Sequence, residues 1–425
     1  MEAQVDLVVV GAGPAGAAAA IVAARAGLEV ALLDKATFPR DKCCGDGLTA
    51  AALRELEQLG LEPPTVASWQ PVSTVVLHAP STRRVELQLP DGTGHHSVVA
   101  RRRELDAALA ELAVKAGARL HTGSALDSVA QTADGALVVR SGARTLRCPA
   151  LIAADGMWSP TRKLVAAPHP AGYRGEWHAF RQYFSGATAD ARHRQHIWFP
   201  ADLLPAYIWS FPLADGTVNI GFGILRDGPV PMGDTGELWR TLLARPEVRA
   251  VLGDGLVPDG AMRAWPIPAR IDEATLSACG GRVLFAGDAA TAPDPMTGEG
   301  IGQALLTGRL AAEAVLHGRS DGAGARPDAV VPATGDAAAV AVAAAYHAAV
   351  RRHLWADHRL ARALGTILAH RRGAEWSLRA VDLNGWTRRN FARWMFEDYP
   401  RAVLGTPRRW RRDLFTGPGA FGGQA

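Results

Sequence analysis

The chain is poor in cysteine, with four residues in 425. Cys43 and Cys44 are neighbours, and a bridge between adjacent cysteines would be badly strained. Four cysteines in so long a chain do not form the disulfide framework of a small secreted protein. We therefore expect a reducing, cytoplasmic setting.

The chain also lacks a long uninterrupted hydrophobic run. Its most apolar stretch, residues 11–33, contains Arg25 and Glu29, and no basic segment followed by an apolar one precedes it. A membrane-spanning helix needs about 20 predominantly apolar residues. We therefore expect neither a signal peptide nor a membrane-spanning helix.

Charge is low and unevenly distributed. Hydrophobic residues make up 48% of the chain and charged residues 21%, which excludes a disordered or collagen-like protein. The formal net charge is only +4, yet residues 351–425 hold fifteen Arg against six Asp or Glu. The C-terminal segment is therefore basic, and the rest of the chain is slightly acidic.

The N-terminus carries the first informative motif. Residues 5–10, Val-Asp-Leu-Val-Val-Val, are typical of a buried parallel strand, and they lead into Gly-x-Gly-x-x-Gly at residues 11–16. An Ala-rich helical stretch and a second strand that ends at Asp34 follow. The glycines let the backbone approach a pyrophosphate at the helix N-terminus, and the acid can accept a hydrogen bond from a ribose hydroxyl. The predicted dinucleotide site consists of Gly11, Gly13, Ala15, Gly16, Asp34 and Lys35.

The changes of pattern along the chain predict an α/β protein with two interleaved domains. Strands and helices alternate in residues 1–70, 100–168 and 276–320, which we assign to a discontinuous, Rossmann-like nucleotide-binding domain. Residues 71–99 and 169–275 hold short alternating strands, aromatics and turn residues. They predict a substrate domain built on antiparallel sheet.

The last part of the chain has a different pattern. Residues 318–335 are rich in Gly, Ala and Pro and predict a surface loop. Residues 337–425 predict a C-terminal helical region that is broken near Gly373 and Gly385. We find no internal repeat and assign no metal ligands.

Two further segments specify the nucleotide. Residues 155–162 follow the pattern D-G-x-x-S-x-x-R, and a strand with Gly-Asp at its end leads into Pro-Met-Thr-Gly-Glu-Gly at residues 295–300. Together with the N-terminal motif, they resemble the FAD-binding fold of the para-hydroxybenzoate hydroxylase type. The resemblance implies that the Asp of Gly-Asp bonds the ribityl chain and that the second helix start lies against the flavin ring and pyrophosphate. It places at the FAD cofactor Asp155, Asp288, Pro295, Gly298 and Gly300.

One basic residue is added by the same resemblance. The segment Arg102-Arg103-Glu104-Leu105-Asp106 predicts the start of a helix. Proteins with this fold carry an Arg there that contacts the cofactor, and we assign that role to Arg102. The alternative is a solvated basic helix face.

Other segments resemble a narrower family. Residues 38–48, which include Cys44 and Gly45, resemble the Cys-Gly loop of the geranylgeranyl reductase family, and residues 207–212 resemble its Y-x-W-x-F-P element. The end of the chain, residues 386–401, also resembles bacterial members. These enzymes reduce carbon–carbon double bonds of isoprenoid chains. The resemblance therefore implies an FAD-dependent reductase of a prenyl chain, with NAD(P)H or a ferredoxin-like carrier as the source of electrons.

The residues of these two segments have alternative roles. Reduction of an isolated alkene needs a hydride donor on one face and a proton. The Cys44 thiol could donate that proton or merely shape the face, and Cys43 is more typical of packing. Tyr207, Trp209 and Phe211 alternate, so on a strand they share one face. That face is either an apolar tunnel wall for a prenyl chain, which the family favours, or a packing surface.

An FAD-dependent monooxygenase or epoxidase is the main rival. It would use the same FAD motifs to act on a prenylated or aromatic substrate. Many such enzymes carry His soon after Gly-Asp-Ala-Ala, whereas this chain continues Thr291-Ala292-Pro293-Asp294. The departure favours the reductase.

The basic C-terminal region admits three interpretations. Its Arg and Trp residues could form a solvated helical surface with the Trp packed inward, lie on an anionic membrane surface, or stack on nucleic-acid bases. An enzyme that acts on lipid-embedded chains has a reason for peripheral contact with the inner face of the membrane. We expect no nucleic-acid partner.

Overall fold

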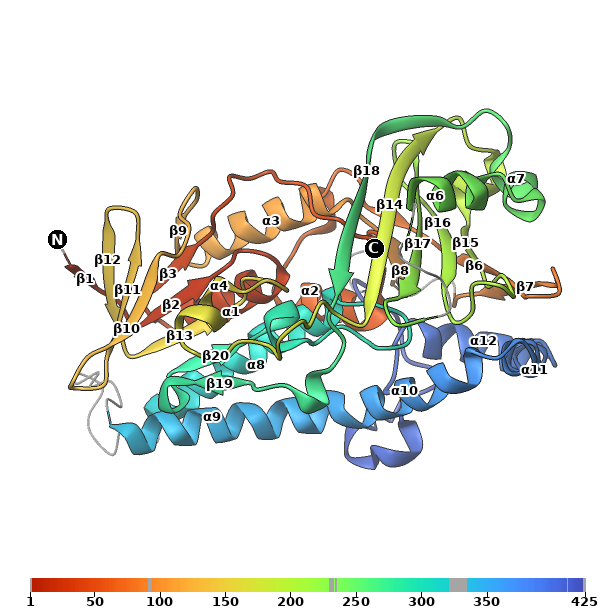
Figure 1. The fold of residues 1–425 in the computed structure, drawn as a ribbon. Helices are drawn as coiled ribbons and strands as arrows, with labels where there is room; N and C mark the ends of the chain where they lie inside the picture. The colour runs from red at the N-terminus through yellow and green to blue at the C-terminus, as the bar shows by residue number, and fades with distance from the viewer. Residues whose placement is uncertain are drawn as a thin grey trace.

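The computed structural model describes residues 2–90, 94–228, 233, 235–320, 335–410 and 412–422. Most of the predicted surface loop at 318–335 lies outside the described residues. Within them, the α/β prediction, with an interleaved antiparallel sheet and C-terminal helices, is confirmed (Figure 1).

A largely parallel sheet forms the left part of the molecule in Figure 1. Its described strands follow the order β19-β20-β13-β2-β3-β9, and β19 alone among them runs antiparallel to its neighbour. They are β2 (Leu7–Val10), β3 (Val30–Leu33), β9 (Arg119–His121), β13 (Ala150–Ala153), β19 (Ser277–Ala278) and β20 (Val283–Phe285). The central strands are continuous apolar runs because both faces of the sheet are covered.

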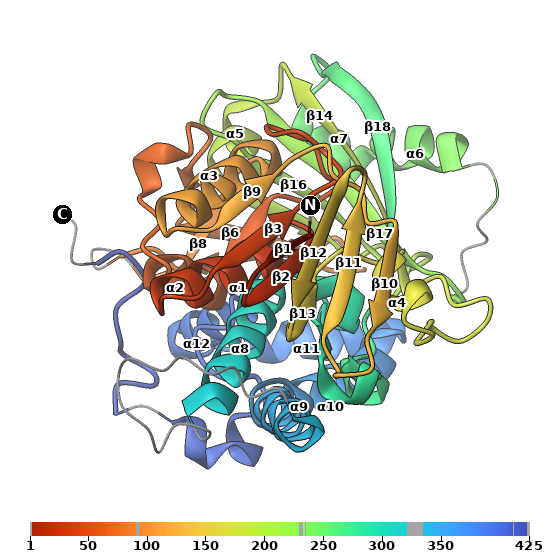
Figure 2. The same cartoon turned by 90° about the vertical axis from the view of Figure 1, so that its left-hand side faces the viewer.

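Helices cover one face of this sheet and a second sheet covers the other (Figure 2). The helices are α1 (Pro14–Arg25), α3 (Arg102–Lys115) and α8 (Ile301–Ser320). The opposite face packs on β1 (Glu2–Gln4), β10 (Ser128–Gln131), β11 (Leu137–Ser141) and β12 (Arg144–Cys148). A Cβ on Gly308 would lie 1.9 Å from the Ala15 carbonyl oxygen, so glycine lets α8 approach α1 closely.

The right part of Figure 1 is a larger, mostly antiparallel sheet. Its order is β18-β14-β17-β16-β15-β6-β7, and β15 pairs in parallel with β6. The strands are β6 (Thr74–His78), β7 (Arg84–Gln88), β14 (Trp177–Ser185), β15 (Gln195–Trp198), β16 (Tyr207–Pro212), β17 (Val218–Leu225) and β18 (Val257–Ile267). The predicted substrate-domain segments 71–99 and 169–275 thus contribute strands to one sheet.

Short helices that the sequence analysis did not predict cover the outer face of that sheet. They are α5 (Ala189–His193), α6 (Thr235–Leu243) and α7 (Pro246–Leu252). Trp239 and Leu242 of α6 share a buried cluster with Ile208, Ile220 and Phe222. The residues that alternate with these along the same strands point to the inner face of the sheet, which the short helices do not cover.

Smaller elements complete the described fold. The strands β4 (Gly47–Thr49), β5 (Gln70–Pro71) and β8 (Ser97–Val99) form a small sheet, and the helices are α2 (Ala50–Gln58) and α4 (Pro160–Leu164). The Thr49 hydroxyl caps α2 by accepting from Ala52 N.

The C-terminal helices run along the lower side of the molecule, from beneath the parallel sheet to beneath the large sheet (Figure 1). They are α9 (Asp336–Val350), a π-helical turn η5 (Arg351–Trp355), α10 (Ala356–Leu368), α11 (Arg371–Val381) and α12 (Gly385–Met395). Gly385 begins α12 behind an Asn384 cap, whereas Gly373 lies inside α11. Among the described residues, no helix combines the length and the apolar character needed to cross a bilayer.

Candidate active site

The Gly-rich turn after β2 leaves an open helix N-terminus. Gly11 has a φ of +96°, and a Cβ there would lie 2.3 Å from the Ala154 carbonyl oxygen. A Cβ on Gly16 would lie 1.7 Å from the Gly11 carbonyl oxygen, so Gly16 permits close packing of helix on strand. The helix begins at Pro14 without a side-chain cap. Its first N–H groups are therefore available to an anionic group.

Asp34, at the end of β3, is engaged with its own loop. Its Oδ2 accepts from Ala12 N and its Oδ1 from Ala36 N, both at 2.8 Å. Arg40 Nη2 lies 4.0 Å from Asp34, and its Nη1 lies 3.0 Å from Asp106. The loop thus places an Arg beside the nucleotide turn, a residue that the sequence analysis did not identify.

Two acids of the later motifs face the same space. Asp155 Oδ2 accepts from Thr161 N at 2.8 Å, whereas its buried Oδ1 has no hydrogen-bond partner among the described residues. Burial raises the pKa of Asp155. Asp288 lies 3.6 Å from Lys42 Nζ, which sits 4.1 Å from the centre of the Trp265 ring. A bound hydroxyl group would satisfy the unpartnered oxygen, as the ribityl and ribose groups of a dinucleotide can.

The Pro-Met-Thr-Gly loop before α8 is shaped by Asp294. Its Oδ1 accepts from Met296 N at 3.0 Å and from Thr297 N at 2.8 Å. Gly298 has a φ of +70°. Burial alone would raise the pKa of Asp294, but Arg401, with Nη1 at 2.6 Å, holds it below its ordinary value. A residue near the C-terminus therefore fixes a loop of the predicted cofactor site.

The Cys-Gly loop is held by a buried polar network. Cys44 Sγ accepts from Asp46 N at 3.3 Å, and burial raises the pKa of the thiol to about 11. Asp46, with a φ of +64°, accepts from Tyr183 Oη at 2.6 Å and from Asn219 Nδ2 at 2.9 Å. Asn219 Nδ2 also donates to the Cys44 carbonyl at 2.9 Å. The loop is therefore fastened to β14 and β17 of the large sheet.

The basic run at the start of α3 points in different directions. Arg102 is buried, donates to both carboxylate oxygens of Asp106 at 2.8 Å and interacts with Cys44. Arg101 turns away to Asp215, and Arg103 is exposed. The structure thus brings Arg102 to the site and leaves Arg103 on a solvated face.

Tyr207, Trp209 and Phe211 share the inner face of the large sheet. The Trp209 Nε1 donates to Asn219 Oδ1 at 3.1 Å, and the Tyr207 hydroxyl donates to the Thr297 carbonyl. A Cβ on Gly221 would lie 2.2 Å from the Trp209 ring, so the strand opposite must carry glycine there. The aromatic row lies against both the Cys-Gly loop and the loop before α8.

One cavity of about 1640 Å³ joins all these parts. Every candidate site residue of the sequence analysis lines it except Gly16, which acts in packing. Beyond the aromatic row the cavity continues between the sheet and the C-terminal helices. Its far end is lined by Ile197, Phe199, Leu364, Leu368, Ala374, Leu378, Val381, Phe391 and Met395. Ligand pockets usually measure about 300–1,000 Å³, so this space suits a dinucleotide together with a second, apolar molecule.

Comparison with known proteins decides the family. Residues 4–307 match the family model described as an FAD binding domain. A menaquinone reductase of Mycolicibacterium smegmatis is 34% identical, over 75% of this chain and 78% of its own. A digeranylgeranylglycerophospholipid reductase 2 of Methanopyrus kandleri is 30% identical, over 73% of this chain and 76% of its own. The chain belongs to the geranylgeranyl reductase family.

A solved structure agrees with this assignment at the level of the fold. The geranylgeranyl bacteriochlorophyll reductase-like protein of Thermoplasma acidophilum has a TM-score of 0.76 at 20% identity, covering 96% of this chain and 100% of that one. As a member of the geranylgeranyl reductase family, the protein is an FAD-dependent oxidoreductase. The predictions of family, enzyme class and FAD as cofactor are confirmed.

Sequence reasoning missed several residues that the fold brings to the cavity of this reductase. Arg40, Lys42 and Trp265 border the cofactor motifs, and Glu299 faces the cavity from the loop before α8. Arg40 and Lys42 belong to the Cys-Gly loop at residues 38–48. Their positive charge close to a dinucleotide motif could have indicated that they lie near the phosphates of the cofactor. The apolar faces of α10–α12 carried no signal, because an amphipathic helix does not reveal which surface it covers.

Proposed function

We propose that the protein reduces carbon–carbon double bonds of a prenyl chain with FAD. The observation that carries the proposal is the continuity of the cavity. Dinucleotide-binding residues at one end and the apolar faces of α10–α12 at the other line the same space. The menaquinone and digeranylgeranylglycerophospholipid named for the two relatives support such a substrate.

The residues of the site suit this chemistry. Bound FAD, when reduced, supplies a hydride. The chain's own contribution is to exclude water, hold the alkene against the cofactor and provide a proton. Trp209 and Phe211 offer rigid apolar area, and the hydrogen bond of Trp209 to Asn219 fixes its ring. Cys44 lies in the same wall as a protonated thiol.

Either NAD(P)H or a ferredoxin-like carrier reduces the flavin in this proposal. The sequence has a single Gly-x-Gly-x-x-Gly motif that follows a strand and opens a helix, which favours transient contact by the donor. Anaerobic mixing of the oxidised holoenzyme with NADH, with NADPH and with reduced ferredoxin identifies the donor by loss of the flavin absorbance.

We also propose peripheral contact of α11 and α12 with an anionic membrane surface. Trp376, Leu383 and Trp386 are 67%, 73% and 64% exposed. Ile367 lines the cavity yet is 50% exposed, so the cavity reaches the surface beside these helices. Exposed Arg side chains surround them at Arg371, Arg372, Arg379 and Arg389. Aromatic and Arg side chains together favour the interface of an anionic bilayer.

Vesicle co-sedimentation tests this contact. The holoenzyme is expected to bind vesicles that contain phosphatidylglycerol, to bind pure phosphatidylcholine weakly, and to be released by high salt. The double variant Arg371→Gln/Arg372→Gln should bind less, whereas Arg103→Gln on α3 should bind like the wild type. Equal binding by all three proteins, or tight binding to DNA, would contradict the proposal.

One experiment tests the reductase itself. The flavin is reduced without oxygen, geranylgeranyl diphosphate, a menaquinone or a prenylated aromatic is added, and flavin reoxidation is followed with the product mass. A gain of two hydrogens without oxygen is expected. Reoxidation that needs oxygen and gives a product heavier by one oxygen atom would favour the monooxygenase or epoxidase instead. Cys44→Ala should slow reoxidation and retain FAD, and loss of FAD would mark Cys44 as structural.

A further inference from the structure

Glu299 is the titratable side chain of the loop before α8 that faces the cavity. Its backbone is fixed, because its carbonyl accepts from Asp294 N at 2.7 Å and its N–H donates to Thr297 Oγ1 at 3.3 Å. Its Oε1 accepts from Ile301 N at 3.1 Å and from Gly302 N at 3.4 Å. The other oxygen, Oε2, has no hydrogen-bond partner in the described part of the chain. The carboxyl group is therefore anchored at one oxygen and free at the other.

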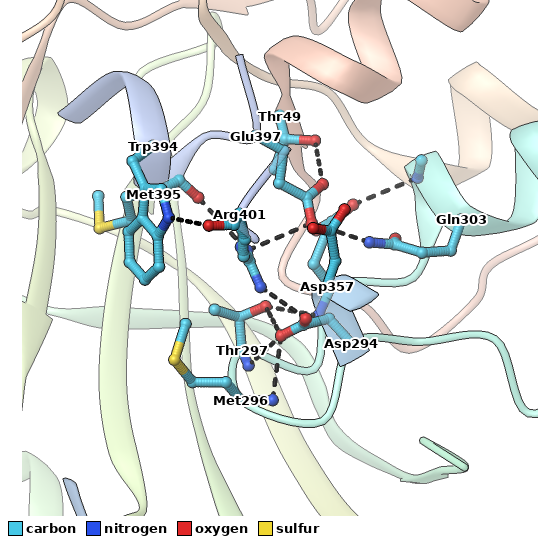
Figure 3. Close-up of polar contacts among 12 residues, drawn as sticks. Thr49, Asp294, Met296, Thr297, Gln303, Asp357, Trp394, Met395, Glu397 and Arg401 are labelled. Atoms are coloured by element: carbon cyan, nitrogen blue, oxygen red, sulfur yellow. Dashed lines mark hydrogen bonds and ion pairs between the residues drawn. The ribbon is translucent and has the colours of Figure 1, made fainter. Parts of the chain in front are cut away.

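A second carboxylate, that of Glu397 on the segment that follows α12, acts electrostatically on Glu299. Figure 3 shows the hydrogen bonds and ion pairs around Glu397. Glu397 Oε1 accepts from Gln303 Nε2 at 3.0 Å, and its Oε2 accepts from Thr49 Oγ1 at 3.1 Å. Arg401 Nη2 lies 3.3 Å from Glu397, while its Nη1 pairs with Asp294. These contacts join α2, α8, the cofactor loop and the C-terminal segment in one buried cluster.

The cluster decides the protonation of Glu299. Burial raises its pKa, and the charge of Glu397 raises it further. The N–H groups of Gly302 and Ile301 and the charge of Arg401 act in the opposite direction, and the pKa is about 8. Glu299 therefore carries a proton at neutral pH and can release it. Of the groups beside it, Cys44 has a pKa of about 11 and Tyr207 a pKa raised above its ordinary value, so both are weaker acids.

We propose that Glu299 is the acid that protonates the alkene. This inference rests on the proposed reductase function. The alkene takes a hydride from the reduced flavin at one carbon and the proton of Glu299 at the other. The carbon–carbon π bond breaks, two C–H bonds form, the flavin is oxidised, and Glu299 regains a proton from water. The anion left on Glu299 is stabilised by the two N–H groups at the start of α8.

Glu299→Gln tests the proposal without changing the shape of the site. The amide oxygen can accept from Ile301 N and Gly302 N, so the loop should fold and FAD should remain bound. Anaerobic reoxidation of the reduced flavin by a prenyl substrate should slow by roughly 10²–10⁴-fold, the range for loss of a general acid. Glu313→Gln, a half-buried partner of Arg309 on α8 that does not line the cavity, serves as the control and should match the wild type.

The pH profile separates an acid from a structural residue. The wild-type rate should fall as pH rises through about 8, where Glu299 loses its proton, and Glu299→Gln should lack that limb. Burial raises the pKa of Glu397 itself, while Arg401 acts against that rise. Glu397→Gln removes the repulsion that its carboxylate exerts on Glu299, so the falling limb of this variant should move to lower pH. The proposal is overturned if Glu299→Gln reacts within about threefold of the wild type, or if the limb is unchanged in both variants. If no prenyl substrate reoxidises the wild type, the proposed function itself has failed.

Discussion

The two ends of the cavity are built on different principles. At the cofactor end, glycines allow close backbone approach, and polar side chains are held by specific partners, as Asp34 is by Ala12 and Arg102 by Asp106. At the far end, three helices contribute apolar side chains and few polar contacts. The first end demands particular residues at particular positions, whereas the second demands volume and hydrophobicity. Substitutions should therefore act on cofactor binding at one end and on substrate selection at the other.

The largest effect is expected at the first Gly-rich turn. Gly16→Ala would place a Cβ 1.7 Å from a backbone oxygen, which cannot move without displacing β2 or α1. We expect a loss of stability of about 3 kcal/mol or more, with no stable FAD complex. At Gly13 the nearest atom to a Cβ is the flexible end of Arg40, at 3.3 Å. Gly13→Ala should therefore fold and bind FAD more weakly. Denaturant unfolding and bound flavin per protein distinguish the two, and a stable, FAD-loaded Gly16→Ala would contradict this assignment.

The next largest effect is expected at Asp398, which anchors the segment that follows α12. Asp398 is fully buried and pairs with Arg54 of α2 and with Arg393 of α12. Burial alone would raise its pKa, but contacts with His96, Arg54 and Arg393 lower it from 3.8 to about 2. Asp398→Asn should cost about 3 kcal/mol, because it leaves the buried Arg393 and the partly buried Arg54 without their anion. Asp254→Asn, whose side chain pairs with Arg249 and is 77% exposed, should cost less than about 1 kcal/mol.

The ion pairs of Asp398 also make the stability of the protein depend on pH. Because the folded pKa of Asp398 is lower than the unfolded value, its contribution is present above pH 3.8 and is lost as pH falls through about 2. The free energy of unfolding of the wild type should fall over that range more steeply than that of Asp398→Asn. Parallel curves would show that Asp398 is not charged in the folded protein.

A smaller effect should appear at the apolar end. Ala374 of α11 is buried and lines the cavity, so Ala374→Phe would shorten it. Each methylene group of the substrate that no longer fits in the cavity loses about 0.8 kcal/mol of hydrophobic stabilisation. The loss of two such groups should lower kcat/KM for a long prenyl chain about tenfold. A short prenyl substrate should be affected less, and FAD binding should not change. Ala380→Phe, on the exposed side of the same helix, is the control. An equal loss for both chain lengths would place the end of the substrate elsewhere.

Much of the cofactor site could be predicted because its motifs are local. The turn at residues 11–16 and the loop at residues 295–300 each depend on a few consecutive residues with fixed backbone geometry. The resemblance to known flavoproteins then linked them, and the structure places them in one cavity. The resemblance had selected Arg102, and the structure supplies the physical reason, because Arg102 is buried beside Cys44 whereas Arg103 is exposed.

The C-terminal region was harder to interpret. Its composition indicated Arg-rich helices and left open whether the Trp side chains pack inward or lie exposed. The structure divides them: Trp394 lines the cavity and donates to the Arg401 carbonyl, whereas Trp376 and Trp386 are exposed. Apolar contact is non-directional, so an amphipathic pattern does not specify its partner.

The sequence by itself determined the order of strands and helices at the nucleotide turn, the FAD motifs and the basic character of the C-terminus, because each is a property of neighbouring residues. Only the tertiary structure decided that α10–α12 complete the cavity and that Glu397 comes close enough to Glu299 to raise its pKa. Those two carboxyl groups stand almost a hundred residues apart in the chain. Their effect on each other's charge depends on burial and distance, which arise only when the chain has folded.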